Sequence, residues 1–281
     1  MTVMPAQAGI QGEHAPASGY SAWIPAFAGM TWPLFIHHLH CGGLLGIGDE
    51  MNLHCIDLGL VEYSQALSWQ EELLRRRCQG EIEDTLLLLE HPPVFTLGRG
   101  GDERHLLNPR QVPVYRVGRG GDATFHGPGQ LVGYPILDLT SHGRDVHAYL
   151  RSLEAVLIAV LAEYGLRAHR REGLTGVWVR EQKIASIGVG VRRWVTYHGF
   201  ALNVDPDLSY FADIVPCGLA GVRMTSMAQL LNRPIALAEV KATVVKTFAD
   251  YFGYTEMLWQ KNSSTQHSVL STRHLASGAS R

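Results

Sequence analysis

The hydrophobic pattern of residues 145–165 predicts the clearest helix in the chain. Apolar residues recur there at intervals of three and four, which places them on one face of a helix. Asp145 is a suitable N-cap, because its carboxylate can accept hydrogen bonds from the first free backbone N–H groups. Gly165 marks the expected end of this helix. Further helices are predicted over residues 62–78, 226–231 and 237–252, the last of them ended by Gly253.

Shorter apolar runs predict strands. The run 85–89 is continuous, which is typical of a buried strand, and the prolines at 92 and 93 end it. Residues 206–214 have no regular pattern and are expected to be irregular. Strands and helices do not alternate strictly along the chain, so the predicted fold class is α+β. Other strands are expected at residues 53–58, 114–117, 131–137, 176–179, 184–191 and 195–204.

Residues 119–130 interrupt this pattern with four glycines and a proline between two predicted strands. Glycine accepts positive φ and allows another group to approach the backbone closely. We therefore interpret this stretch as a wall against which a ligand lies. A wide hairpin turn is the simpler interpretation, but a turn needs few polar side chains. This stretch carries Arg119, Asp122, Thr124, His126 and Gln130.

Composition excludes several classes of protein. The 281 residues are 46% hydrophobic, which is ample for a buried core. The net charge of −2 does not favour a nucleic-acid-binding protein that works by bulk electrostatics. No apolar run approaches the ~18 residues that a membrane span needs. We expect a protein that binds neither nucleic acid nor membrane.

Residues 1–50 differ in composition from the remainder. They contain no Lys or Arg, although the whole chain has 24, so they resemble neither a signal peptide nor a transit peptide. Residues 5–10 and 23–31 resemble the translation of an interspersed bacterial DNA repeat. We expect residues 1–50 to be a disordered leader or the product of a start assigned too early, with Met51 as the true beginning. Residues 51–261 are expected to form one folded domain, and residues 262–281 a disordered tail.

The four cysteines are Cys41, Cys55, Cys78 and Cys217, and no two of them form a CxxC pair. This spacing argues against a disulfide framework or a structural zinc site and suits a reducing cytoplasm. Cys55 and Cys78 lie in predicted secondary structure and are most simply buried apolar residues. Cys217 lies between a proline and a glycine beside the irregular segment, where a side chain can face a cleft. It is either inert or a nucleophile.

A nucleophilic cysteine needs a group that stabilises its thiolate. Lys183 precedes a predicted strand and has apolar neighbours. Lysine at a strand end usually extends into solvent. If Lys183 were buried about 4 Å from Cys217, its charge would stabilise the thiolate by about 4 kcal/mol at an effective dielectric constant of ~20. His126 is a second possible base, with His91 and His198 as weaker ones; each could instead be a histidine hydrogen-bonded within the fold.

Five sequence windows occur in the order found in one known family. They are EHPPVFTLG (90–98), RGG with HGPGQL (119–131), KIASIG (183–188), HGFALN (198–203) and PCG (216–218). Over residues 51–253 the chain closely resembles the octanoyltransferases of lipoate biosynthesis. This resemblance implies a cytoplasmic transferase with a mixed β-sheet flanked by helices, as in the catalytic domains of lipoate and biotin ligases. The leader has no counterpart in the family.

The resemblance also implies roles for individual residues. Cys217 matches the nucleophile that forms an acyl thioester, and Lys183 matches the residue that keeps this cysteine as a thiolate. No metal and no cofactor are implied. The implied substrate-binding residues are Arg119, Gly120, Gly121, Asp122, Ala123, Thr124, Phe125, His126, Ser186, Ile187, Gly188, Gly199, Phe200 and Ala201.

The implied reaction has two steps. Cys217 takes the octanoyl group from octanoyl-acyl carrier protein, and the ε-amine of a lysine in a lipoyl domain then attacks the acyl-enzyme. The implied acceptors are the lipoyl domains of 2-oxo acid dehydrogenase complexes and the glycine cleavage H protein. Because acyl carrier proteins are acidic, we expect docking on Arg75, Arg76 and Arg77, or otherwise on Arg192 and Arg193.

Three other classes remain open from the residues alone. An ATP-dependent lipoate or biotin ligase would adenylate its acid and would need no cysteine nucleophile. A cysteine hydrolase would transfer the acyl group to water and normally has a Cys-His-Asp/Asn set. A non-catalytic acyl-binding protein would keep the fold without the chemistry.

Overall fold

The structure is a computed structural model that describes residues 51–219 and 221–261, all within the unit Gly48–Arg281. The predictions for residues 1–50 and 262–281 lie outside the described residues. No helix in the described part of the chain is long and apolar enough to cross a membrane.

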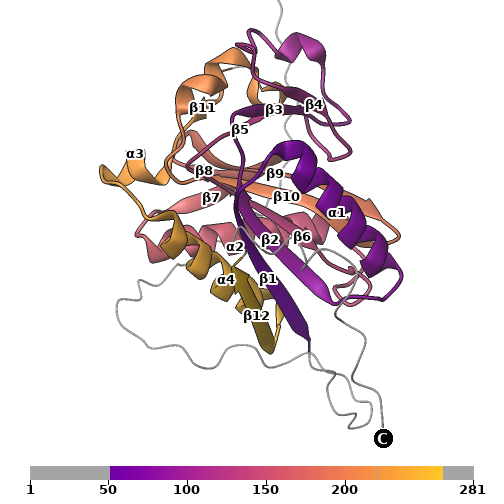
Figure 1. Cartoon of the computed structure of the whole chain (residues 1–281). Coiled ribbons are helices and arrows are strands. Elements are labelled where there is room, and N and C mark those ends of the chain that lie inside the picture. The colour runs from indigo at the N-terminus through magenta and orange to yellow at the C-terminus, as the bar shows by residue number, and fades with distance from the viewer. Residues whose placement is uncertain (1–50, 220, 262–281) are drawn as a thin grey trace, which may run out of the picture. The chain divides into compact units, whose positions relative to one another are not determined.

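Helices and strands are labelled as in Figure 1. In chain order they are β1 (Asn52–Leu60), α1 (Tyr63–Cys78), β2 (Asp84–Glu90), β3 (Val94–Leu97), η1 (Glu103–His105), β4 (Val114–Arg116), β5 (Ala123–His126), β6 (Gln130–Ile136), α2 (Val146–Glu163), β7 (Ala168–Arg171), β8 (Leu174–Val179), β9 (Gln182–Arg192), β10 (Val195–Asn203), η2 (Leu208–Asp213), η3 (Pro216–Gly218), β11 (Arg223–Met224), α3 (Met227–Leu231), α4 (Leu237–Phe252) and β12 (Glu256–Lys261).

The larger of the two sheets in the described residues is mixed and has nine strands. Its strand order is β12-β1-β2-β6-β10-β9-β8-β7, and β11 pairs with β9. β1 is parallel to both β12 and β2, whereas β6 is antiparallel to both β2 and β10. The mixed sheet with helices on its faces confirms the predicted α+β class.

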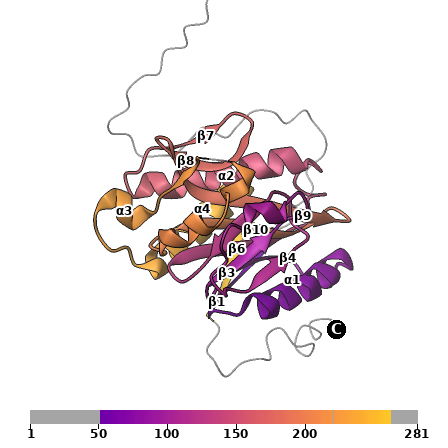
Figure 2. The ribbon, with the colours of Figure 1, turned by 90° about the horizontal axis from the view of Figure 1, so that it is seen from above.

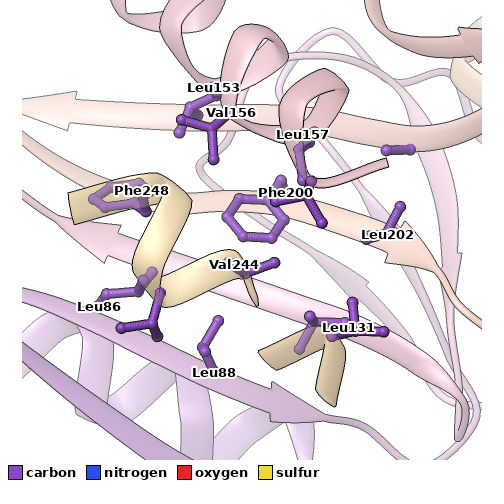
Figure 3. Packing of buried hydrophobic residues seen from close by; sticks show 14 of the residues in the cluster. Leu86, Leu88, Leu131, Leu153, Val156, Leu157, Phe200, Leu202, Val244 and Phe248 are labelled. Atoms are coloured by element: carbon purple, nitrogen blue, oxygen red, sulfur yellow. The ribbon is translucent and has the colours of Figure 1, made fainter. Parts of the chain in front are cut away.

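Strand β2 lies at the centre of the core. Leu86 and Leu88 pack in the cluster formed with α2 and α4, whereas Leu87 and Leu89 pack in the cluster formed with α1. Successive side chains of a strand point to opposite faces, so a strand covered on both faces is apolar throughout. Figure 2 shows α2 and α4 on one side of the sheet and α1 on the other. Figure 3 shows the first cluster, with Leu153, Val156 and Leu157 of α2 and Val244 and Phe248 of α4 facing Leu86, Leu88, Leu131, Phe200 and Leu202.

Two of the three long helices, α2 and α4, have an end that the sequence predicts. The Asp145 carboxylate accepts hydrogen bonds from the backbone N–H groups of His147 (2.8 Å) and Ala148 (3.0 Å), so it caps α2. α4 ends at Gly253, whose φ of 78° lies in the left-handed region that glycine adopts without strain.

A second, three-stranded sheet of order β4-β3-β5 contains part of the glycine-rich stretch. The apolar side chains of β3 and β5 pack on Phe211 and Ile214. Residues 208–213 are a 3₁₀ helix capped by Asp207 rather than an irregular segment. The carboxylate of Asp207 accepts a hydrogen bond from the Ser209 N–H, and such short local turns have no periodic apolar signal.

Candidate active site

A pocket is formed by β5 of the small sheet and by β6, β9 and β10 of the large sheet. It contains about 460 Å³ of space, its open mouth included. The turn η3 and the start of α1 complete the wall. The pocket is lined by Tyr63, Arg119, Gly121, Asp122, Thr124, His126, Tyr134, Ser186, Ile187, Gly188, His198, Gly199, Phe200, Ala201 and Cys217.

Cys217 has an unusual backbone conformation. Its φ of 57° and ψ of 21° are left-handed, which few residues other than glycine adopt. The turn is held in place because the Val215 N–H donates to the His105 carbonyl (2.8 Å) and the Gly218 N–H donates to the Val215 carbonyl (3.1 Å). Strained residues are found disproportionately at functional sites. Here the conformation leaves the Cys217 side chain in the pocket wall.

Lys183 is buried beside this cysteine. Its side chain is 1% exposed, so it does not extend into solvent. Its Nζ donates to Cys217 Sγ at 2.9 Å and lies 5.7 Å from the centre of the Trp178 ring. The Thr225 N–H donates to the Lys183 carbonyl at 3.0 Å, which fixes the start of β9. The structure thus brings together the two residues that the sequence analysis paired.

Gly176 provides the space for the Lys183 side chain. A Cβ placed on Gly176 would lie 2.6 Å from Cε and 3.2 Å from Nζ of Lys183. The φ of Gly176 is 135°, which also excludes most other residues. A side chain at this position would therefore displace the lysine from Cys217.

Arg119 supplies a buried positive charge in the pocket wall. One terminal nitrogen donates to the Thr96 carbonyl and hydroxyl and to the Asp122 carbonyl, each at 2.8 Å. Burial lowers the pKa of this guanidinium. A Cβ on Gly98 would lie 2.8 Å from the other terminal nitrogen, and a Cβ on Gly188 would lie 3.1 Å from Cδ. The glycines of these windows therefore make room for a cation as well as for a ligand.

His126 belongs to a chain of hydrogen bonds that determines its tautomer. The Gln130 amide nitrogen donates to the Phe125 carbonyl and to Asn203 Oδ1, so Gln130 Oε1 accepts from His126 Nδ1 (2.8 Å). His126 Nε2 then carries the lone pair and faces the Thr96 hydroxyl at 3.4 Å. Burial lowers the pKa of His126 well below its usual value. His126 is therefore a neutral histidine hydrogen-bonded within the fold.

The two other histidines considered as bases are also buried. His91 Nδ1 donates to the Val61 carbonyl (2.7 Å), so His91 Nε2 accepts from the Tyr134 hydroxyl (2.8 Å). Burial lowers the pKa of His91 to about 4 and that of His198 to about 3. None of the three histidines hydrogen-bonds to Cys217 in the described part of the chain, whereas Lys183 does.

The pocket includes all the predicted substrate-binding residues except Gly120, Ala123 and Phe125. Strand β5 explains two of these exceptions, since Thr124 and His126 face the pocket and the alternate residues face away from it. Ala123 and Phe125 lie instead in the apolar cluster of the small sheet. The Gly120 N–H donates to the Val189 carbonyl at 2.8 Å and joins the loop to β9.

Two tyrosines of the pocket were not identified from the sequence. Tyr63 is the first residue of α1, and Tyr134 lies in the middle of β6. Burial raises the pKa of Tyr63 to about 12 and also raises that of Tyr134. Both tyrosines are therefore neutral, and they place two phenol groups beside the Arg119 guanidinium in the pocket wall. The described residues contain no group of three or more His, Cys, Asp or Glu arranged to hold a metal ion.

Comparisons with known proteins agree with one another. The family model "Lipoyl protein ligase A/B catalytic domain" matches residues 62–249. An octanoyltransferase of Syntrophotalea carbinolica is 54% identical over 192 residues, which are 68% of this chain and 90% of the relative. An octanoyltransferase of Geobacter metallireducens is 53% identical over 192 residues, which are again 68% of this chain and 90% of the relative.

Solved structures with a similar fold are lipoate ligases. A lipoate-protein ligase A bound with ATP has a TM-score of 0.63 and 16% identity, and the match covers 77% of this chain and 90% of that one. A putative lipoate protein ligase from T. acidophilum with bound lipoic acid has a TM-score of 0.62, also at 16% identity, with 77% and 91% covered. At this identity the likeness concerns the fold alone.

Proposed function

The chain belongs to the octanoyltransferases of the lipoyl protein ligase A/B catalytic-domain family, and on this basis we propose that Cys217 and Lys183 catalyse its octanoyl transfer. The protein is an acyltransferase of lipoate biosynthesis. The observation that carries the proposal is the 2.9 Å contact between Lys183 Nζ and Cys217 Sγ at the wall of the pocket.

In the first step the Cys217 thiolate attacks the carbonyl carbon of an octanoyl thioester. A new C–S bond forms, the bond to the leaving sulfur breaks, and the Lys183 ammonium gives that sulfur a proton. One thioester replaces another, so no ATP is consumed. The buried position of Lys183 supports this role, because an ammonium shielded from water interacts more strongly with a thiolate.

In the second step an amine attacks the acyl-enzyme and forms an amide. The neutral Lys183 accepts the proton that the amine loses, and Cys217 leaves as a thiolate. The family implies a lipoyl domain as the acceptor. We assign octanoyl-acyl carrier protein as the donor and the lipoyl domains of 2-oxo acid dehydrogenase complexes and the glycine cleavage H protein as acceptors, in the cytoplasm.

The test is the intact mass of the protein after incubation with octanoyl-acyl carrier protein without ATP. The parent protein is expected to gain one octanoyl group, and Cys217→Ala to gain none. Cys78→Ser is the matched control, because Cys78 is also partly exposed and lies outside the pocket. Adding a lipoyl domain should move the octanoyl group to that domain. A Cys217→Ala protein that still transfers octanoate would refute the assignment.

A further inference from the structure

Helix α2 carries a fully buried carboxylate, Glu154, behind the candidate active site. Its Oε1 accepts a hydrogen bond from the Gly176 N–H at 2.9 Å. Its Oε2 lies 2.7 Å from Arg151 and 3.1 Å from Arg170, whose side chains are 47% and 42% exposed. The two arginines thus balance the charge on Oε2 and leave Oε1 to hold the backbone of β8.

The Gly176 backbone is in turn in contact with Lys183. A Cβ on Gly176 would meet both Cε and Nζ of the lysine, so the lysine side chain lies directly against this backbone. Lys183 Nζ then reaches Cys217 Sγ. A continuous path therefore runs from Glu154 through Gly176 and Lys183 to Cys217, and each step is a direct contact between buried or partly buried groups.

We propose that Glu154 is a positioning residue for Lys183. By fixing the Gly176 N–H, it fixes the surface on which the lysine side chain rests and so keeps the ammonium within reach of the cysteine. The proposal rests on the proposed roles of Cys217 and Lys183. Glu154 does not line the pocket, so it acts on the reaction only through the lysine.

Two variants test the length of the Glu154 side chain and its charge separately. Glu154→Gln keeps an oxygen at the same distance from the Gly176 N–H but loses the charge, and its amide nitrogen no longer accepts from Arg151 and Arg170, whose exposed side chains can turn into solvent. Glu154→Asp keeps the charge near the two arginines but is shorter by one methylene. The readout is the rate of alkylation of Cys217 by iodoacetamide at pH 7, measured on the Cys217 peptide by mass spectrometry, together with kcat and KM.

The expected result is an alkylation rate and a kcat that fall about tenfold in Glu154→Asp and stay within about threefold in Glu154→Gln, with KM unchanged in both. Asp57→Asn is the matched control. Asp57 is another buried carboxylate, paired with Lys241 at 2.6 Å and absent from the pocket lining, so its loss should lower stability and leave alkylation unchanged.

An alkylation rate in Glu154→Asp equal to that of the parent would overturn the proposal. An alkylation rate that falls further in Glu154→Gln than in Glu154→Asp would also overturn it. So would an alkylation rate that falls as far in Asp57→Asn as in Glu154→Asp. The alkylation readout does not depend on transfer activity. If Cys217→Ala still transfers octanoate, the proposed function fails, and the order of the alkylation rates still decides the role of Glu154.

Discussion

Arg77 and Asp84 are joined by a hydrogen bond of 2.8 Å between the end of α1 and the start of β2. Asp84 is 6% exposed and also accepts a hydrogen bond of 2.8 Å from the Tyr254 hydroxyl. Burial raises the pKa of Asp84, but hydrogen bonds from His142 and Arg77 outweigh it, so the pKa is lowered. The guanidinium of Arg77 therefore stabilises a buried carboxylate.

The first prediction is that Arg77→Ala lowers stability without affecting the use of the carrier substrate. Loss of one partner from a largely buried pair costs about 3 kcal/mol. Urea unfolding measures this loss, and steady-state kinetics should give an unchanged KM for octanoyl-acyl carrier protein. A raised KM at unchanged stability would show that this arginine binds the carrier after all.

The neighbouring arginines are also engaged. Arg75 lies 2.8 Å from Glu72, and Arg76 lies 3.7 Å from Glu81. The run of three arginines is thus largely neutralised by acids of α1 and of the segment that follows it. An acidic partner is attracted by unpaired positive charge, so we expect this cluster to bind the carrier less well than its sequence indicates.

The second prediction is that octanoyl-acyl carrier protein docks on the hairpin between β9 and β10. Arg192 and Arg193 are exposed there and form no ion pair with any other described residue. Arg193→Glu should raise KM for octanoyl-acyl carrier protein about threefold or more in low salt, and less in high salt. Arg233→Glu, at another exposed arginine, is the control. Equal effects of the two reversals would mean that net charge, rather than this hairpin, sets KM.

The long helices are predictable from sequence because local signals suffice. α2 and α4 are amphipathic. Asp145 marks the start of α2 by its capping hydrogen bonds, and Gly253 marks the end of α4 by its left-handed backbone conformation. β3 and β5 were missed because each has four residues and lies beside prolines or glycines. They are strands because they pair with each other, with Thr96 opposite Thr124, and a single segment does not reveal its partner.

For the same reason, some residues of the candidate site were predictable from sequence and others were not. Cys217 and Lys183 are 34 residues apart. The need of a nucleophilic cysteine for a nearby cation suggested the pair, and the order of the family windows supported it. Tyr134 lies in a strand that is buried at every position, so periodicity indicates core and not which face borders a pocket. Tyr63 reaches the pocket only because α1 packs across the sheet. Tertiary packing, which no local pattern encodes, determines these positions.

The third prediction is a loss of stability on acidification. The pKa values of His91 and His198 are lowered from 6.5 to about 4 and about 3, in each case mainly by burial, and Arg119 adds to the effect on His198. The unfolded chain therefore binds protons below about pH 6.5 that the folded protein excludes. The stability from these neutral histidines is fully present above that pH, and each histidine removes about 1.4 kcal/mol per pH unit between about pH 6.5 and its own folded pKa.

Urea unfolding at pH 7, 6 and 5 measures this slope. His198→Asn is expected to be less stable at pH 7 but to lose less stability between pH 7 and 5, because one titrating group is gone. Equal stability of the parent protein at pH 7 and pH 5 would contradict the burial of His91 and His198 as neutral side chains.

The fourth prediction separates two roles of Lys183. Lys183→Ala removes the cation 2.9 Å from the cysteine sulfur, so iodoacetamide should alkylate Cys217 about tenfold more slowly at pH 7, and octanoyl transfer should be lost.

Lys183→Arg keeps a positive charge but offers no accessible base, since guanidinium does not give up its proton. If Lys183 acts only by its charge, then in Lys183→Arg iodoacetamide should alkylate Cys217 at the parent rate, and octanoyl transfer should also match the parent. We expect the alkylation of Cys217 to persist and octanoyl transfer to fail. That result would assign proton transfer to Lys183 in addition to stabilisation of the thiolate. Alkylation of Lys183→Ala at the parent rate would show that the contact between these two residues does not activate the cysteine.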